Sequence, residues 1–446
     1  MTQVDEQPVD GEAALRAVLL SRGYLRLLLL SVLLGVPIAL ACFFFVGLQH
    51  AIQHGVWEAL PEAVGYHRAP WWWPLPTLLL AGLIMAPIAT RMRGGGGHLP
   101  VNGLGGTPIG PEALPGVILA ALATLPLGVV LGPEAPLMAV GSGLALLALR
   151  RAKTATDPRS ATVIATAGST AAISTILGGP IVAAILVVEA AGLAGGQLVV
   201  LLLPCLVASA TGALVFTGFG QWTGLSIGAL ELPAVPPDVN PDAGDFLWGV
   251  PVAVLVALVV ATAHRLGRYT ARWTSEHTAP RTVFCALAVG VCLTAYALLT
   301  GRSPEEAALS GQATLGELAA HPHAWSVAAL LALVVCKALA WGISLGCLRG
   351  GPIFPAVLIG AVVAVACSAL PGFGVPPALG LGIAAAAVVV TGLPLTSAIL
   401  ATLLLGDDAY HQMPLIVIAA VTAHLATQLI NRPRTREDRK ARDGGS

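Results

Sequence analysis

The sequence predicts an all-α protein that crosses a membrane several times, and three observations lead to this fold class. The chain of 446 residues is 56% hydrophobic and only 10% charged, whereas soluble domains are roughly 25% charged. Apolar runs long enough to span a lipid bilayer recur along it, beginning with Leu27 to Val46. Glycine (51) and proline (33) are both frequent, as is typical of membrane helices that pack closely or break.

The basic residues predict the orientation of these spans. They cluster near residues 22–26, 91–93, 150–159, 265–281 and 432–442, and the positive-inside rule places all five clusters in the cytoplasm. Both termini are then cytoplasmic, and we expect a multi-pass protein of the plasma membrane. The first apolar run is longer than a signal-peptide core and has no cleavage site after it, so we expect it to be retained. The net charge of zero gives no reason to expect a nucleic-acid partner.

The chain divides into two transmembrane halves. The segment between them is rich in proline and aspartate and has no basic residue, which indicates an external loop. The expected parts are a cytoplasmic N-terminal tail (1–22), a first transmembrane half (23–219), the external loop (220–245), a second transmembrane half (246–431) and a basic cytoplasmic tail (432–446).

The two halves carry similar proline-containing breaks between their apolar segments. Gly132-Pro133-Glu134-Ala135-Pro136 is followed at an offset of 351 − 132 = 219 by Gly351-Pro352-Ile353-Phe354-Pro355. Gly179-Pro180 is followed at an offset of 394 − 180 = 214 by Leu393-Pro394. Apolar segments broken at matching positions of two halves point to a transporter-type site where the halves meet.

Glu134 is the leading candidate for a functional residue. It lies between two apolar runs, and a charge at the bilayer centre costs on the order of 3 kcal/mol or more. We expect it to stand just outside a helix N-terminus, where unpaired N–H groups and the helix dipole favour an anion. A tethered carboxylate there would compete with a free anion and act as a gate. The alternative is a structural carboxylate that only caps the helix.

The glycine-rich segment Gly94 to Pro100 is a second candidate. Consecutive glycine N–H groups could face an anion, although a plain linker explains the composition too. A phosphate-binding loop is not favoured, because no Gly-Lys-Ser or Gly-Lys-Thr closes the segment. His50 and His54 have the spacing of metal ligands on one helix face, but ordinary interfacial histidines are the better interpretation.

Other polar residues in apolar surroundings do not form a catalytic or metal-binding group. The seven cysteines lack metal-ligand spacing and are interpreted as small core residues, so no cofactor is expected. Lys337 is expected to pair with a helix C-terminus or a carboxylate. Ser142 lies in a Gly-Ser-Gly patch that favours close helix packing over a nucleophile. Asp407 and Asp408 lie near a span.

Three segments resemble the CLC family of chloride channels and proton/chloride antiporters. Gly132 to Pro136 resembles the family's Gly-Arg-Glu-Gly-Pro segment, so that Glu134 matches its external gating glutamate. Gly351 to Pro355 resembles Gly-x-Phe-x-Pro, and Gly96 to Pro100 resembles Gly-Ser-Gly-x-Pro. The three occur in the family's order, and the resemblance extends from the first span to the last.

The resemblance implies a homodimer with one anion pathway in each subunit, built as an inverted repeat of tilted and broken helices. It places the anion at helix N-termini near the midplane. The implied anion-binding residues are Gly97, His98, Gly132, Pro133, Ala135, Gly351, Pro352, Ile353 and Phe354, and Glu134 and Glu189 are the implied proton pathway.

Several positions depart from the family pattern. Gly97 stands where the family has an anion-binding serine, and Ile353 where it has a phenylalanine, with Phe354 one place later. Pro133 and Ala135 replace the arginine and glycine beside the gate. Ala190 occupies the place of the internal proton-transfer glutamate, with Glu189 directly before it, and no tyrosine follows Tyr410.

The predicted function is therefore CLC-type transport of an anion, with chloride favoured by the resemblance alone. The resemblance includes both voltage-gated channels and proton-coupled antiporters, and Ala190 favours channel-like or weakly coupled transport. The alternatives are an antiporter specialised for another halide such as fluoride, or an unrelated secondary transporter of small solutes. An enzyme is not expected, because no embedded nucleophile with a base, and no set of metal ligands, occurs in the sequence.

Overall fold

The structure is a computed structural model that describes residues 8–104, 108–152, 157–177, 179–224, 232, 240–406 and 409–431. Within these residues every regular element is a helix, and the only extended pairing is an isolated bridge. The α-helices of the first half are α1 (Pro8–Leu19), α2 (Arg22–His54), α3 (Leu60–Ala63), α4 (Pro74–Arg91), α5 (Leu114–Thr124), α6 (Glu134–Arg151), α7 (Pro158–Ile173), α8 (Pro180–Ala191) and α9 (Gly195–Thr223). Those of the second half are α10 (Ala243–Glu276), α11 (Thr278–Thr300), α12 (Gln312–Ala320), α13 (Val327–Cys347), α14 (Ile353–Cys367), α15 (Val375–Thr391), α16 (Pro394–Leu405) and α17 (Ala409–Asn431).

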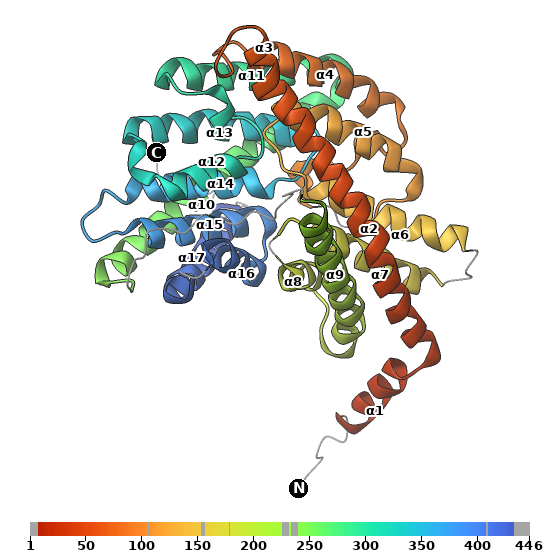
Figure 1. Cartoon of the computed structure of the whole chain (residues 1–446). Coiled ribbons are helices and arrows are strands. Elements are labelled where there is room, and N and C mark those ends of the chain that lie inside the picture. Colours follow the sequence, from red (N-terminus) through yellow and green to blue (C-terminus); the bar gives the residue numbers. More distant parts are fainter. Residues whose placement is uncertain are drawn as a thin grey trace, which may run out of the picture.

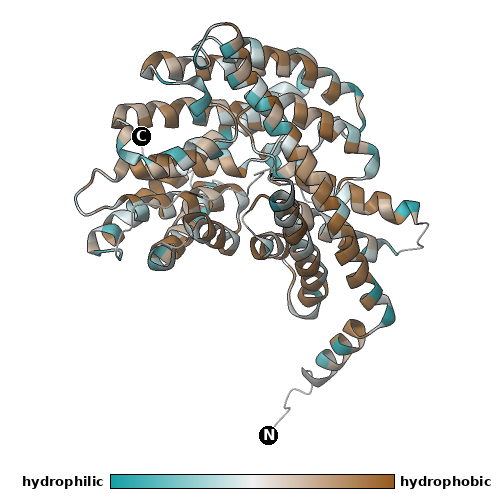
Figure 2. Cartoon of the chain, viewed as in Figure 1, coloured by the Kyte–Doolittle hydropathy of each residue, from teal (hydrophilic) through white to brown (hydrophobic). Residues whose placement is uncertain are grey.

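The fold combines long apolar helices with shorter ones. In the part of the chain that the structure describes, 7 helices are long and apolar enough to cross a membrane, and α8, α14, α15 and α16 are shorter apolar helices. Figure 2 shows hydrophobic residues along almost the whole length of these helices. The first span extends beyond the predicted run from Leu27 to Val46, because α2 continues through the polar residues on both sides. Hydropathy marks only the apolar part of a helix, so it understates the length.

The second half repeats the first, helix by helix. The equivalent pairs are α2 and α10, α4 and α11, α6 and α14, α7 and α15, α8 and α16, and α9 and α17. Within each half the neighbours are the same: α6 packs on α7 as α14 packs on α15, and α7 packs on α9 as α15 packs on α17. Figure 1 shows the first half on the right and the second half on the left, with α6 and α14 leading away from the centre in opposite directions. The predicted inverted repeat is confirmed.

Glycine allows the same close helix crossing in both halves. A Cβ atom on Gly141 of α6 would overlap the carbonyl oxygen of Gly168 on α7. The equivalent positions are Gly360 of α14 and Gly382 of α15, where a Cβ atom on either glycine would likewise overlap the carbonyl oxygen of the other. The backbones can approach this closely only because neither residue has a side chain. The predicted close-packing patch around Ser142 is therefore present.

Several predicted features fall on residues outside the description. They are Lys153, Gly178, Asp407, Asp408, most of the segment 220–245, and the basic tail 432–446. Helix α9 continues to Thr223 and α10 begins at Ala243, so the helical parts of both halves reach a few residues into the segment expected to be the external loop.

Candidate functional site

The two halves are joined at their centre by one antiparallel bridge. The Gly132 N–H donates to the Gly351 carbonyl at 2.8 Å, and the Gly351 N–H donates to the Gly132 carbonyl. These two glycines are equivalent in the repeat. An antiparallel bridge between equivalent residues is two-fold symmetric, so the axis that relates the halves passes through it. The next residues agree, with Pro133 at φ −83° and ψ −2° and Pro352 at φ −87° and ψ −14°.

Glu134 begins α6 and reaches across this junction. Its side chain is fully buried (0% exposed). Its Oε1 accepts a hydrogen bond from the backbone N–H of Phe354, in the first turn of α14, at 2.9 Å. Its Oε2 has no hydrogen-bond partner among the described residues. The carboxylate thus occupies the N-terminus of the other half's helix.

The flanking glycines leave room for this carboxylate. A Cβ atom on Gly132 or on Gly351 would overlap Glu134 Oε2. Neither glycine has a positive φ, so backbone conformation alone does not require glycine there. The close approach of the carboxylate does.

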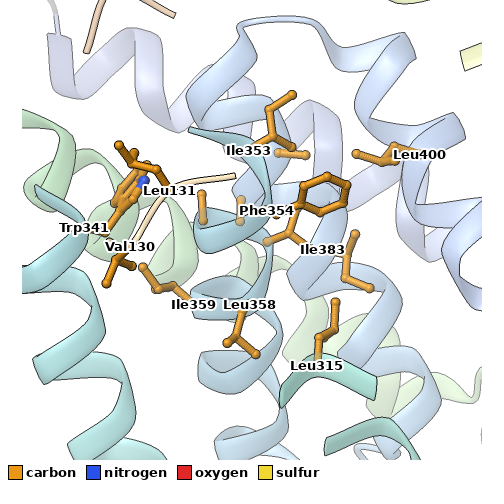
Figure 3. Close-up of a cluster of buried hydrophobic side chains, with 14 of the residues drawn as sticks. Val130, Leu131, Leu315, Trp341, Ile353, Phe354, Leu358, Ile359, Ile383 and Leu400 are labelled. Atoms are coloured by element: carbon orange, nitrogen blue, oxygen red, sulfur yellow. The ribbon is translucent and has the colours of Figure 1, made fainter. Parts of the chain in front are cut away.

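Apolar side chains surround the helix end that holds the carboxylate. Figure 3 shows Ile353 and Phe354 at the start of α14, with Ile383 and Leu400 beside the Phe354 ring and Leu131 across the junction. All five side chains are at most 2% exposed. Excluding water lowers the local dielectric, which strengthens an interaction between an anion and backbone N–H groups.

A cavity of about 1300 Å³ lies beside this junction. It is lined on α6 by Ala135 and Ser142, so it reaches the residue next to Glu134. His98, Ala190 and Arg159 also line it. Arg159 belongs to one of the basic clusters predicted to be cytoplasmic, and that prediction places this cavity on the inner side. Gly97, with φ 107°, lies directly before His98.

Glu189 lies at a second junction of the halves, between α8 and α16. Its Oε1 accepts from the Leu395 N–H at 3.0 Å, and its Oε2 accepts from the Thr396 N–H at 2.8 Å and the Thr396 hydroxyl at 2.6 Å. Glu189 therefore holds the first turn of α16. Its neighbour Ala190, and not Glu189, lines the cavity.

Residues 77–428 match the family described as voltage gated chloride channel. The chain belongs to this family. The match covers most of the chain and confirms the predicted resemblance to CLC proteins and the predicted class of function, anion transport across a membrane.

Other relatives agree with this assignment. Proteins named putative ion-transport protein YfeO, from Escherichia coli strain SE11 and from Escherichia coli O1:K1, are 31% and 30% identical over 167 residues. That segment is 37% of this chain and 39% of the relatives, so the chain matches well under half of their length.

Solved CLC structures share the fold over almost the whole chain. A slow cyanobacterial Cl⁻/H⁺ antiporter has a TM-score of 0.75 at 15% identity, covering 92% of this chain and 96% of that one. A CLC-type fluoride/proton antiporter has a TM-score of 0.68 at 19% identity, covering 91% and 95%. At these identities the similarity establishes the fold.

Lys337 and His54 each contact other protein groups. Lys337 is fully buried, and its Nζ donates to the carbonyls of Ala307, Ala308 and Leu309 at 2.9, 2.9 and 3.4 Å. These carbonyls follow the 3₁₀ turn η6 (Pro304–Glu306), so the expected pairing with a helix end is confirmed. His54 lies 3.4 Å from Glu58, and no group of three metal-ligating side chains occurs in the described parts of the chain.

Sequence reasoning missed two features of the site. The first is the direct pairing of Gly132 with Gly351, which the 219-residue offset could have suggested. The second is Arg349, which directly precedes Gly350-Gly351 and bonds to Gly95 of the glycine-rich loop. A lone basic residue between an apolar run and the second helix break was the available signal.

Proposed function

We propose that this protein conducts chloride across the plasma membrane through a pathway that Glu134 gates. The observation that carries the proposal is the buried Glu134 carboxylate on the Phe354 N–H, at the end of a helix. That position favours an anion, and a carboxylate that occupies it excludes a free one. When Glu134 takes up a proton and leaves, chloride takes its place.

The inner half of the route is open in this proposal. The cavity reaches Ala135, so an anion that enters from the cytoplasmic end has only the Glu134 carboxylate left to pass. The rest of the binding path is formed by the glycine-rich loop and the two helix breaks. Its residues are Gly97, His98, Gly132, Pro133, Ala135, Gly351, Pro352, Ile353 and Phe354.

Proton coupling, where it occurs, involves Glu134 and Glu189. Ala190 lines the cavity but cannot carry a proton, and Glu189 is the carboxylate directly before it in the sequence. A path with one mobile carboxylate and a wide inner cavity favours channel-like or weakly coupled transport over tight exchange. Fluoride or another halide is the second candidate cargo, because Gly97 offers no hydroxyl to chloride.

The protein works as a transporter in a lipid bilayer, without a cofactor or enzymatic step, as a homodimer with both termini in the cytoplasm. The long exposed apolar surfaces of α9 and α17, which carry Leu214 (74% exposed) and Leu429 (70% exposed), suit lipid or subunit contact. Cross-linking of the purified protein in vesicles measures the subunit number.

Flux from proteoliposomes tests the proposal. Vesicles loaded with chloride, fluoride or nitrate are diluted into a gradient, and anion efflux and proton uptake are recorded together at several external pH values. Glu134→Gln is expected to allow efflux that no longer depends on external pH and to abolish any proton movement. An absence of anion efflux from the wild type, or a Glu134→Gln variant with the wild-type pH profile, would contradict it.

A further inference from the structure

Arg349 connects the two candidate anion-binding segments. It follows α13 and stands two residues before Gly351, whose N–H and carbonyl form the central bridge. Its Nε donates to the carbonyl of Gly95 at 3.0 Å, two residues before Gly97. Its own carbonyl accepts from the buried Thr124 hydroxyl at 3.0 Å. The side chain is therefore fixed between the glycine-rich loop of the first half and the bridge segment of the second.

Arg349 differs from the other arginines that are partly buried. Within the described residues these are Arg281, Arg302 and Arg349. Arg281 pairs with Glu276 at 2.6 Å, and Arg302 pairs with Glu306 at 2.7 Å. Arg349 has no carboxylate partner among the described residues. Charges removed from water are normally paired with an opposite charge, so the missing counter-ion at Arg349 requires an explanation.

Lys337 shows how a cation can be satisfied without a counter-ion. An ammonium group has three N–H donors, and Lys337 directs them at three carbonyl oxygens. Arg349 is not saturated in this way. Its Nε bonds to Gly95, and its Nη1 bonds to the carbonyls of Cys347 and Leu348 at 3.4 and 3.1 Å. Its Nη2, which carries two further N–H donors, makes no hydrogen bond to any described residue.

The Nη2 group of Arg349 lies beside the glycine-rich loop. A Cβ atom on Gly95 would stand 3.8 Å from it, so Nη2 lies over the glycine-rich loop. This loop directly follows α4, which ends at Arg91, in a predicted cytoplasmic basic cluster. Arg349 is partly exposed, so an ion from the aqueous side can approach it.

We propose that Arg349 Nη2, beside Gly95, binds a small inorganic anion and forms a side-chain subsite next to the glycine-rich loop. The proposal rests on the anion transport proposed above and adds a residue that selects and concentrates its cargo. The guanidinium is held in place by three carbonyl oxygens, so little side-chain freedom is lost when the anion binds. A charged donor and a charged acceptor also make the stronger class of hydrogen bond.

Calorimetry on the purified full chain tests the subsite. The compared variants are Arg349→Gln, Arg349→Lys and, as a matched control, Arg93→Gln, which removes an exposed arginine from the same loop. Arg349→Gln is expected to weaken chloride binding by about tenfold or more. Arg349→Lys keeps the charge without the fixed planar group and should fall between Arg349→Gln and the wild type. Arg93→Gln should change the affinity by less than twofold.

Two outcomes would overturn the proposal: an Arg349→Gln affinity within twofold of the wild type, or equal losses in Arg349→Gln and Arg93→Gln. Thermal melting of each variant reports whether it folds. If Arg349→Gln does not fold, Arg349→Lys serves as the test. A chloride affinity of Arg349→Lys lowered by more than twofold supports the subsite, and a smaller change rejects it. Wild-type efflux and its pH response at Glu134 are measured alongside. If these are intact while Arg349 has no effect, only the subsite fails.

Discussion

The two halves of the molecule have the same backbone arrangement but carry different functional side chains. Both carry the same helix breaks, the same bridge glycines and the same glycine crossing. At both junctions, however, the first half supplies the carboxylate and the second half supplies the N–H donors. Glu134 bonds to Phe354 at the start of α14, and Glu189 bonds to Leu395 and Thr396 at the start of α16.

The equivalent positions of the second half carry no charge. By the two offsets, Ile353 is equivalent to Glu134 and Leu403 is equivalent to Glu189. The N-termini of α14 and α16 therefore lie where the two halves meet, and carboxylates of the first half bind to both of them. A symmetric scaffold with an asymmetric gate needs only one residue that moves, while the other half remains a fixed set of donors.

The two carboxylates are held to different extents. Glu134 has one donor, and one of its oxygens has no partner among the described residues. Glu189 has three donors. A charge-assisted hydrogen bond contributes about 1.5–3 kcal/mol, so Glu134 leaves its place at a lower cost in hydrogen bonds than Glu189. This is the contrast expected between a gate and a fixed tie.

Gly351→Ala is expected to have the largest effect on this contrast. The added Cβ atom would occupy the place of Glu134 Oε2, so the carboxylate must leave the Phe354 N–H although it keeps its charge. Losing that bond favours the open gate by about tenfold. Chloride efflux from proteoliposomes at neutral pH should rise accordingly, with a weaker dependence on external pH.

Two further variants separate this effect from general damage to packing. Gly350→Ala adds a Cβ atom whose three nearest neighbours would be Leu131 Cβ at 2.6 Å, Leu125 and the Gly132 carbonyl, and not Glu134, so it should lower the melting temperature without opening the gate. In a Glu134→Ala background, Gly351→Ala should add nothing further to efflux. A full additional increase in that background would show that Gly351 acts on something other than the carboxylate.

A smaller effect is expected at Gly97, where the second half has no counterpart to the glycine-rich loop. The family's serine cannot simply be restored there, because Gly97 has φ 107° and a side chain at such an angle costs about 1–3 kcal/mol. Gly97→Ser and Gly97→Ala share that strain, and only the serine adds a hydroxyl. We expect the serine variant to bind chloride several-fold more tightly than the alanine variant. Equal calorimetric affinities of the two variants would place Gly97 away from the anion.

The sequence predicted what depends on pattern and not what depends on contacts. Hydropathy and the repeated Gly-Pro breaks predicted the helical halves, the short central helices and the position of Glu134. The offset of 219 residues did not reveal that Gly132 pairs with Gly351, because a repeat says which residues are equivalent and not which ones touch. Glu134 was expected just outside a helix N-terminus, whereas it is the first residue of α6, and its bond to α14 depends on how two distant segments pack. Arg349 was overlooked for the same reason, since only its surroundings show that it lacks a counter-ion.

The smallest effect on anion efflux is expected from Glu189→Gln. Ala190 lines the cavity and Glu189 faces α16, so chloride efflux should change by less than about twofold. Removing a residue that binds the anion would have a larger effect, because the anion would lose a charge-assisted hydrogen bond. The stability should fall, because the new amide group must face either the Leu395 N–H or the two Thr396 donors.

Thr396→Val is the matched control, since it removes one of the three donors and leaves the carboxylate in place. If Glu189 carries protons, Glu189→Gln abolishes proton uptake and Thr396→Val retains it, while both lower the melting temperature. Proton uptake that survives in Glu189→Gln would leave Glu189 as a tie between α8 and α16, and Glu134 would then be the single carboxylate of the pathway that exchanges protons.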